Sequence, residues 1–153
     1  MSKGEFAVIG TAEVPCGNYP DRTEFEIAYT LSRMAIKDAG IDKSQIGAVL
    51  GAAHIMGSEY NTEVVFGRLP EAIGLRNCQV TGQTVSGGAS SHSIRRTAEG
   101  ILRAGEAEYV LIVHAQRFSQ FPMNEQAQYF AIAGSDLEFE VPYGMTYNAL
   151  AAM

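Results

Sequence analysis

A glycine-rich segment between a short apolar run and a helical pattern carries residue types that could support chemistry. From Val80 to Ser91 the chain reads V-T-G-Q-T-V-S-G-G-A-S-S. Glycine lets a backbone turn sharply and approach a ligand. A helix that starts there presents unpaired N–H groups and the positive end of its dipole. Such a turn can stabilise a thiolate, an oxyanion or an enolate, although the commoner structure is a simple tight turn in which Ser90 caps the helix.

The three histidines are the other candidates for chemistry. His114 follows the apolar run Tyr109–Val113, at the carboxyl end of a predicted strand, where open α/β sheets bind their ligands. It is a candidate catalytic residue, and the alternative is a polar strand end. His92 lies one turn into the predicted helix and is expected to make a packing or partner contact. His54 also follows a predicted strand, so it is expected near the edge of a sheet.

The two cysteines, Cys16 and Cys78, do not form a disulfide framework in a chain of this length, and no metal-ligand spacing is present. The sequence therefore predicts no metal site. Cys78 is expected to act as a small hydrophobic residue, as free cysteines usually do.

Alternating strand and helix patterns must position these residues. The first helix is predicted to begin with Asp21 as N-cap, paired with Glu24, and to end at Gly40. Pro70 is expected to break the helix predicted at Asn61–Leu75, or to start a second one. The full predicted order is a strand at Phe6–Ile9, the helix after Asp21, a strand at Ile46–Ala53, the helix at Asn61–Leu75, a strand at Cys78–Thr81, a glycine-rich turn at Gly82–Gly88, a helix at Ser90–Ala104 and a strand at Tyr109–Val113.

This β-α-β-α-β-α-β order predicts an α/β fold, a layered α-β-α arrangement with a mostly parallel sheet and right-handed crossovers. Residues 1–115 are predicted to form the α/β core. Residues 116–153 lose the clear periodicity and are interpreted as the start of a loop or cap region. The pattern at Tyr147–Met153 begins a helix without a C-terminal signal, which suggests a truncated chain.

Composition excludes several classes of function. The 153 residues carry 11 Lys and Arg against 17 Asp and Glu, a net charge of −6. An acidic chain is a poor match for broad nucleic-acid or anionic-membrane binding. No window approaches the roughly 20 apolar residues that span a bilayer, and no secretory signal opens the chain. A soluble, cytoplasmic protein is therefore expected.

Two stretches resemble the thiolase superfamily. In Gly74–His114 a strand, a nucleophile turn and a helix lead to the family pattern G-x-A-E-x-V-L, present as Gly105–Leu111. The segment Phe139–Met145, F-E-V-P-Y-G-M, is similar to the lipid-transfer-protein branch of the family, the sterol carrier protein thiolase-like proteins. Full members of the family are far longer, so the resemblance implies that this chain is an N-terminal fragment with the thiolase-like N-terminal fold.

The resemblance includes one departure from the thiolase pattern. Counted back from Gly105, the position of the nucleophilic cysteine falls on Gly88, and a glycine cannot form an acyl-enzyme. The turn is similar to that of thiolase-like aldolases that cleave a β-hydroxyacyl-CoA by retro-aldol chemistry and typically pair with an OB-fold, zinc-ribbon protein. The resemblance implies substrate binding at Gly87, Gly88, Ala89 and Ser90.

The resemblance thus implies a protein that acts on acyl-CoA thioesters by aldol-type or Claisen-type chemistry, related to acetyl-CoA acetyltransferases and other acyltransferases of lipid metabolism. A coenzyme A thioester would be the substrate, with no covalently bound cofactor, and a homodimer is expected. The alternative is a non-catalytic thiolase-like subunit that works with a partner protein. A third hypothesis, a nucleotide-binding α/β domain, would need a G-x-G-x-x-G turn after the first strand, which Gly10–Ala12 does not provide.

Overall fold

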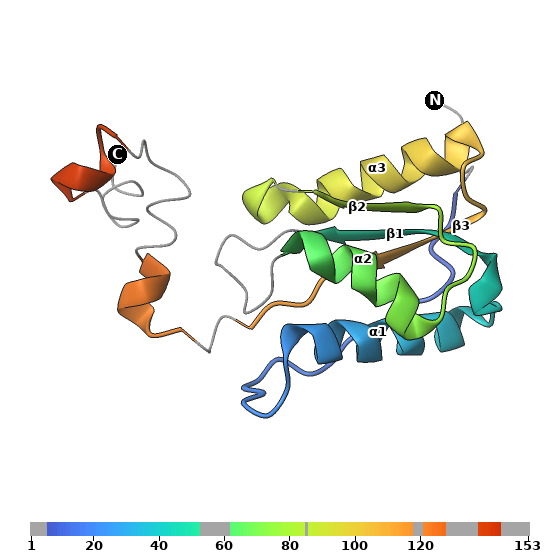
Figure 1. The fold of residues 1–153 in the computed structure, drawn as a ribbon, viewed down its shortest axis with the longest axis horizontal. Helices are drawn as coiled ribbons and strands as arrows, with labels where there is room; N and C mark the ends of the chain where they lie inside the picture. Colours follow the sequence, from blue (N-terminus) through green and yellow to red (C-terminus); the bar gives the residue numbers. More distant parts are fainter. Residues whose placement is uncertain (1–5, 53–61, 85, 118–120, 128–137, 145–153) are drawn as a thin grey trace.

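In the computed structural model, the described residues are 6–52, 62–84, 86–117, 121–127 and 138–144. They form a parallel sheet with helices on both of its faces (Figure 1). The helices are α1 (Glu24–Ala39), α2 (Thr62–Ile73) and α3 (Ser90–Ala104), and the strands are β1 (Ile46–Ala52), β2 (Val80–Thr84) and β3 (Tyr109–Val113). The predicted α/β class is confirmed.

The sheet has the strand order β2-β1-β3, and both pairings are parallel. Ala48 of β1 lies opposite Val80 on one side and opposite Val110 on the other. Parallel neighbours require a crossover between successive strands. The helices that follow β1 and β2 supply these crossovers, as the alternating pattern predicts.

Each face of the sheet is covered by its own apolar cluster. On one face, Val49 and Leu111 pack with Ile27 of α1 and Leu69 of α2. On the other face, the neighbouring β1 residues Ala48 and Leu50 pack with α3, whose apolar stripe is Ile94, Ala98 and Ile101. Successive side chains of a strand point to opposite faces, so β1 is buried on both sides. Figure 1 shows α3 on one side of the sheet and α1 on the other.

The first helix begins two residues later than predicted. Thr23, not Asp21, is the N-cap: its Oγ1 accepts a hydrogen bond from the Glu26 N–H at 3.1 Å, and Glu26 Oε2 accepts from the Thr23 N–H at 2.7 Å. Both Asp21 with Glu24 and Thr23 with Glu26 fit the spacing of a capping box. The reciprocal bonds form in the second register, and this leaves Glu24 available for a contact described below.

Replacing Thr23 by alanine is expected to lower the free energy of unfolding by about 1 kcal/mol, because the side-chain acceptor for an amide at the start of α1 is lost. Urea unfolding measures the change. Thr97→Ala is the matched control, since Thr97 is exposed inside α3 and its hydroxyl bonds only the Ser93 carbonyl. Equal losses from the two variants would contradict the capping role of Thr23.

Two other predicted boundaries are wrong for local reasons. α2 continues through Pro70, which lies in its last turn, so the proline removes a hydrogen bond only near the helix end, and Gly74 (φ 78°) follows the helix. β2 begins at Val80 instead of Cys78 and extends to Thr84. Gly82 is therefore inside the strand, where an added Cβ would lie 3.5 Å from a Leu50 methyl carbon. The glycine turn starts later than predicted.

The predicted strand Phe6–Ile9 is absent: this segment has no regular secondary structure. The residues after it are held by α1 instead of the sheet. The Thr11 N–H donates to Asp38 Oδ2 at 2.9 Å, and Gly10 lies so close to α1 that an added Cβ would be 2.6 Å from the Ala35 carbonyl oxygen. An apolar run alone does not determine which element accepts its backbone hydrogen bonds.

The predicted ends of two helices, α1 and α3, are confirmed. Helix α3 has the predicted bounds, and Gly40 and Gly105 end α1 and α3 in left-handed conformations.

Beyond residue 117 the structure describes a short helical segment at 123–127 and a 3₁₀ helix at Val141–Tyr143. The predicted helix start at Tyr147–Met153 lies outside the described residues. Among those described, no helix is long and apolar enough to cross a membrane.

Candidate functional site

The candidate site lies at the carboxyl edge of the sheet. Because all three strands are parallel, their carboxyl ends meet at one edge. The turn into α3 follows β2 there, His114 follows β3, and α1, which precedes β1, begins on the same side. Ligands of open α/β sheets bind outside this edge.

The glycine turn forms the start of α3. Gly87–Ala89 make a 3₁₀ turn, and α3 begins at Ser90. Ser90 is buried, and its Oγ accepts a hydrogen bond from the Ser86 N–H at 3.0 Å, which fixes the turn against the helix. The N-cap residue Ala89 provides no side-chain hydrogen bond to the first turn of α3. The leading amides of α3 therefore lack a side-chain cap.

Gly88 is an open position at the start of α3. It is exposed, and a Cβ added to it would have no heavy atom within 4 Å. Its backbone is not in the left-handed region, so the conformation itself does not require glycine. The fold therefore has room for a side chain at Gly88, and nothing in the described packing demands glycine there.

His114 is exposed at the end of β3. Close to it in sequence, the Arg117 N–H donates to Glu24 Oε1 at 2.8 Å, which joins the segment after β3 to the first turn of α1. The two residues are 93 positions apart, and no local pattern in the sequence predicts this contact.

The structure brings only some of the predicted residues together. His114 and the turn at Gly87–Ser90 share the carboxyl edge, separated by the width of β1. His92 is exposed on α3. His54 lies outside the described residues. α3 is not a buried helix: the sheet covers one stripe of it, and His92, Arg95 and Arg96 are exposed.

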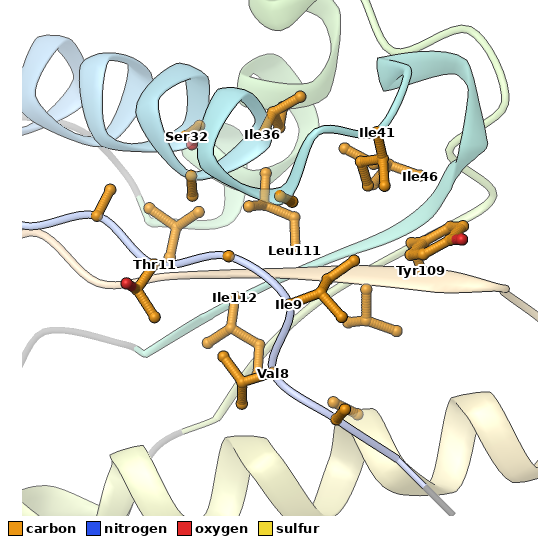
Figure 2. A pocket seen from close by; sticks show the side chains of 18 of the residues that line it. Val8, Ile9, Thr11, Ser32, Ile36, Ile41, Ile46, Tyr109, Leu111 and Ile112 are labelled. Carbon is orange, nitrogen blue, oxygen red and sulfur yellow. The ribbon is translucent and has the colours of Figure 1, made fainter.

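A cavity of about 630 Å³ lies elsewhere, along β3. Its walls are the N-terminal segment, one side of α1, one side of α3 and the whole of β3 up to His114. Figure 2 shows Val8, Ile9 and Thr11 on one side of it, opposite Leu111 and Ile112. None of the four predicted substrate-binding residues lines this cavity, so it is distinct from the glycine turn.

Cys78 is half-buried just before β2, and burial raises the pKa of its thiol above the ordinary value. Cys16 is exposed in the loop before α1. A thiol whose pKa is raised has a smaller thiolate fraction at neutral pH, and the thiolate is the nucleophile. Neither cysteine lies in the turn into α3.

Cys78 is therefore expected to react with iodoacetamide more slowly than Cys16 at pH 7.5, and its rate is expected to keep rising at alkaline pH. Mass spectrometry of peptides after timed alkylation measures both rates in one sample. Incubation with acetyl-CoA should leave no stable mass increase on either cysteine. Stoichiometric acetylation of Cys78 would show that the thiol is a nucleophile and that the alignment with Gly88 is wrong.

Comparisons with known proteins match this fold to thiolase-like proteins. An aldolase described as Ltp2-ChsH2(DUF35) superposes with a TM-score of 0.66 at 21% identity over 91% of this chain and 33% of that one. The acetyl-CoA acetyltransferase from Syntrophomonas wolfei gives 0.59 at 21% identity over 69% and 27%. The priming β-ketosynthase of the R1128 polyketide pathway gives 0.57 at 20% identity over 66% and 29%. No family model and no curated protein sequence matches the chain.

The fold of the chain is thus that of the thiolase-like proteins. The chain spans about a third of the length of these solved structures. At these identities the likeness defines the architecture, and the activity has to be argued from the residues.

Proposed function

We propose that this chain is the N-terminal part of a longer thiolase-fold enzyme that makes or breaks a carbon–carbon bond in an acyl-CoA thioester without a cysteine nucleophile. The observation that carries the proposal is the exposed Gly88 at the start of α3, with open space where its side chain would be. The solved structures of the same fold include an aldolase and an acetyl-CoA acetyltransferase. A retro-aldol reaction is the version of this chemistry that needs no acyl carrier.

The proposed reaction acts on a β-hydroxyacyl-CoA. A base removes the proton of the β-hydroxyl, the Cα–Cβ bond breaks, and its electron pair forms an enolate on the thioester oxygen. The β-carbon leaves as an aldehyde or ketone, and a proton added to Cα gives the shorter acyl-CoA. N–H groups aimed at the thioester oxygen stabilise the enolate. The backbone amides at Gly87 and Gly88 are the proposed donors, whereas the Ala89 N–H already donates to the Ser86 carbonyl at 3.0 Å.

His114 is the proposed proton-transfer residue of this part of the protein. It lies at the same edge of the sheet as the turn, and histidine is the side chain that enzymes use most often for proton transfer.

The assay that tests the proposal gives the full-length protein two substrates in parallel. A β-hydroxyacyl-CoA should yield a carbonyl compound and a shorter acyl-CoA, detected by mass spectrometry. A β-ketoacyl-CoA with free CoA, the thiolase substrate pair, should yield no thiolysis product. Thiolysis would refute the cysteine-free mechanism. Failure of both reactions, also with an added OB-fold, zinc-ribbon partner, would favour the alternative of a non-catalytic subunit.

We further propose that the full-length protein forms a homodimer through the outer edge of β2. This strand is at the end of the sheet, with Thr81 and Gln83 exposed and no charged side chain along it. An unprotected edge strand tends to pair with another strand, and two-fold pairing is the commonest arrangement. Light scattering of the unsubstituted full-length protein is expected to report a dimer. Thr81→Lys places a charge at this edge and should shift the protein toward monomer. A monomeric unsubstituted protein would refute the dimer.

A further inference from the structure

Ser90 is the buried residue of an exposed turn. Its relative exposure is 5%, whereas Ser86 and residues 88–89 before it are exposed. It lies one helical turn before Ile94, which packs on β1, so Ser90 belongs to the part of α3 that the sheet holds in place. A side chain this buried meets protein atoms, and the rest of a longer protein can only bury it further. Ser90 therefore contributes to a site beside it through what its hydroxyl holds.

The Ser90 hydroxyl binds backward, to the turn. The N-cap of α3 is Ala89, whose side chain makes no cap bond. The Ser90 Oγ accepts a hydrogen bond from the Ser86 N–H, four residues earlier, at 3.0 Å. A capping serine uses its oxygen in the opposite direction, for the N–H two or three residues ahead. The bond to Ser86 thus stabilises the turn that leads into the helix.

Ser86 is held through both of its backbone polar groups. Its N–H donates to Ser90, and its C=O accepts from the Ala89 N–H at 3.0 Å. The Ser86 C=O and the Gly87 N–H belong to one planar peptide unit, and this unit is trans. Fixing the carbonyl therefore also fixes the Gly87 N–H, which points the opposite way from that carbonyl.

The two glycine amides are the first N–H groups of the 3₁₀ turn. The internal bonds of this turn begin with the Ala89 N–H, so Gly87 and Gly88 precede the first residue that donates within it. Glycine has more backbone freedom than any other residue, and two adjacent glycines keep a direction poorly without an anchor. Donors that are fixed before a reaction stabilise developing charge without a cost of reorganisation. The bond between Ser86 and Ser90 supplies such an anchor.

We propose that Ser90 is a positioning residue, whose buried hydroxyl fixes Ser86 so that Gly87 and Gly88 direct their N–H groups at the thioester oxygen. This inference rests on the proposed function, which assigns those two amides to the enolate. The thioester oxygen gains its negative charge only as the Cα–Cβ bond breaks. Loss of alignment therefore weakens binding of the transition state more than binding of the substrate. The expected signature is a lower kcat with little change in KM.

Ser90→Ala in the full-length protein tests the proposal with the β-hydroxyacyl-CoA assay. It removes the acceptor of the Ser86 N–H and should lower kcat about 100-fold, the order of loss for a misplaced or missing donor. KM should stay within about twofold of the unsubstituted value. Ser90→Thr keeps the hydroxyl and should retain most of the activity.

The matched control is Ser32→Ala. Ser32 is also buried, with 1% exposure, and its hydroxyl donates to the Ala28 carbonyl within α1 at 2.7 Å. Its replacement removes the same hydroxyl far from the turn and should leave kcat unchanged, and urea unfolding should show that all three variants are folded. A raised KM with unchanged kcat in Ser90→Ala would overturn the proposal, and so would an equal loss of kcat in Ser90→Thr.

Amide hydrogen exchange separates this proposal from the proposed function, because it needs no substrate. Residues 86–88 should exchange about tenfold faster in Ser90→Ala than in the unsubstituted protein, the factor expected for the loss of one hydrogen bond. Ser32→Ala should leave their exchange unchanged. If the unsubstituted protein catalyses neither reaction, the proposed function fails, while faster exchange still supports the hold of Ser90 on the turn. Unchanged exchange in Ser90→Ala, or faster exchange with full activity, would overturn the positioning role.

Discussion

The 153-residue chain by itself is expected to turn over CoA thioesters more slowly than the full-length protein. Each proton-transfer group that the rest of the protein supplies should account for a factor of about 10²–10⁴ in the rate. The described residues offer two histidines, His92 on the exposed face of α3 and His114 at the end of β3. The proposed amide donors at the start of α3 stabilise charge but move no proton. The chemistry of this chain is thus incomplete in the proposed mechanism.

The measurement is a side-by-side aldolase and thiolase assay of the short and full-length proteins. Circular dichroism of the short chain must first show folded α/β structure, so that inactivity is not the result of unfolding. A mixture of the short chain and the separately expressed remainder should restore part of the activity. Comparable turnover from the short chain would mean that all catalytic groups lie within it, and the proposed division of labour would be wrong.

Gly88→Val is expected to lower turnover by the full-length protein about 100-fold, the order of loss that a displacement of about 1 Å in a reacting group produces. A side chain at this position projects into the space where the thioester would approach the amides of α3. The stability should change little, because an added Cβ meets no heavy atom within 4 Å and the backbone is not in the left-handed region. The substitution therefore separates a role in the site from a role in the fold.

The matched control is Gly100→Val. Gly100 lies in the same helix, is exposed and also has no heavy atom within 4 Å of an added Cβ, but it is nearly three turns from the start of α3. Its replacement should leave turnover unchanged, and urea unfolding should show that both variants remain folded. Full activity of Gly88→Val would place substrate binding away from this turn.

The sequence by itself determined the class of the fold. Alternating strand and helix patterns, with apolar runs such as Tyr109–Val113, require a parallel sheet covered on both faces, because such strands have no polar side to expose. The ends of α1 and α3 followed from Gly40 and Gly105, which adopt the left-handed conformation that favours glycine. The glycine turn before α3 was equally local, and its position after a strand placed it at the carboxyl edge.

Only the tertiary structure decided which backbone groups pair. Phe6–Ile9 has the composition of a buried strand, but Gly10 packs on α1. The hydrogen bonds of a strand depend on a neighbour that need not be close in sequence. The choice of Thr23 over Asp21 as the N-cap was likewise open in the sequence, since two overlapping residue pairs fit the capping-box motif. In the structure the Glu24 carboxylate accepts a hydrogen bond from the amide of Arg117, 93 residues away. Long-range contacts of this kind leave no periodic signal, so sequence patterns determine the elements of this protein and the fold determines their partners.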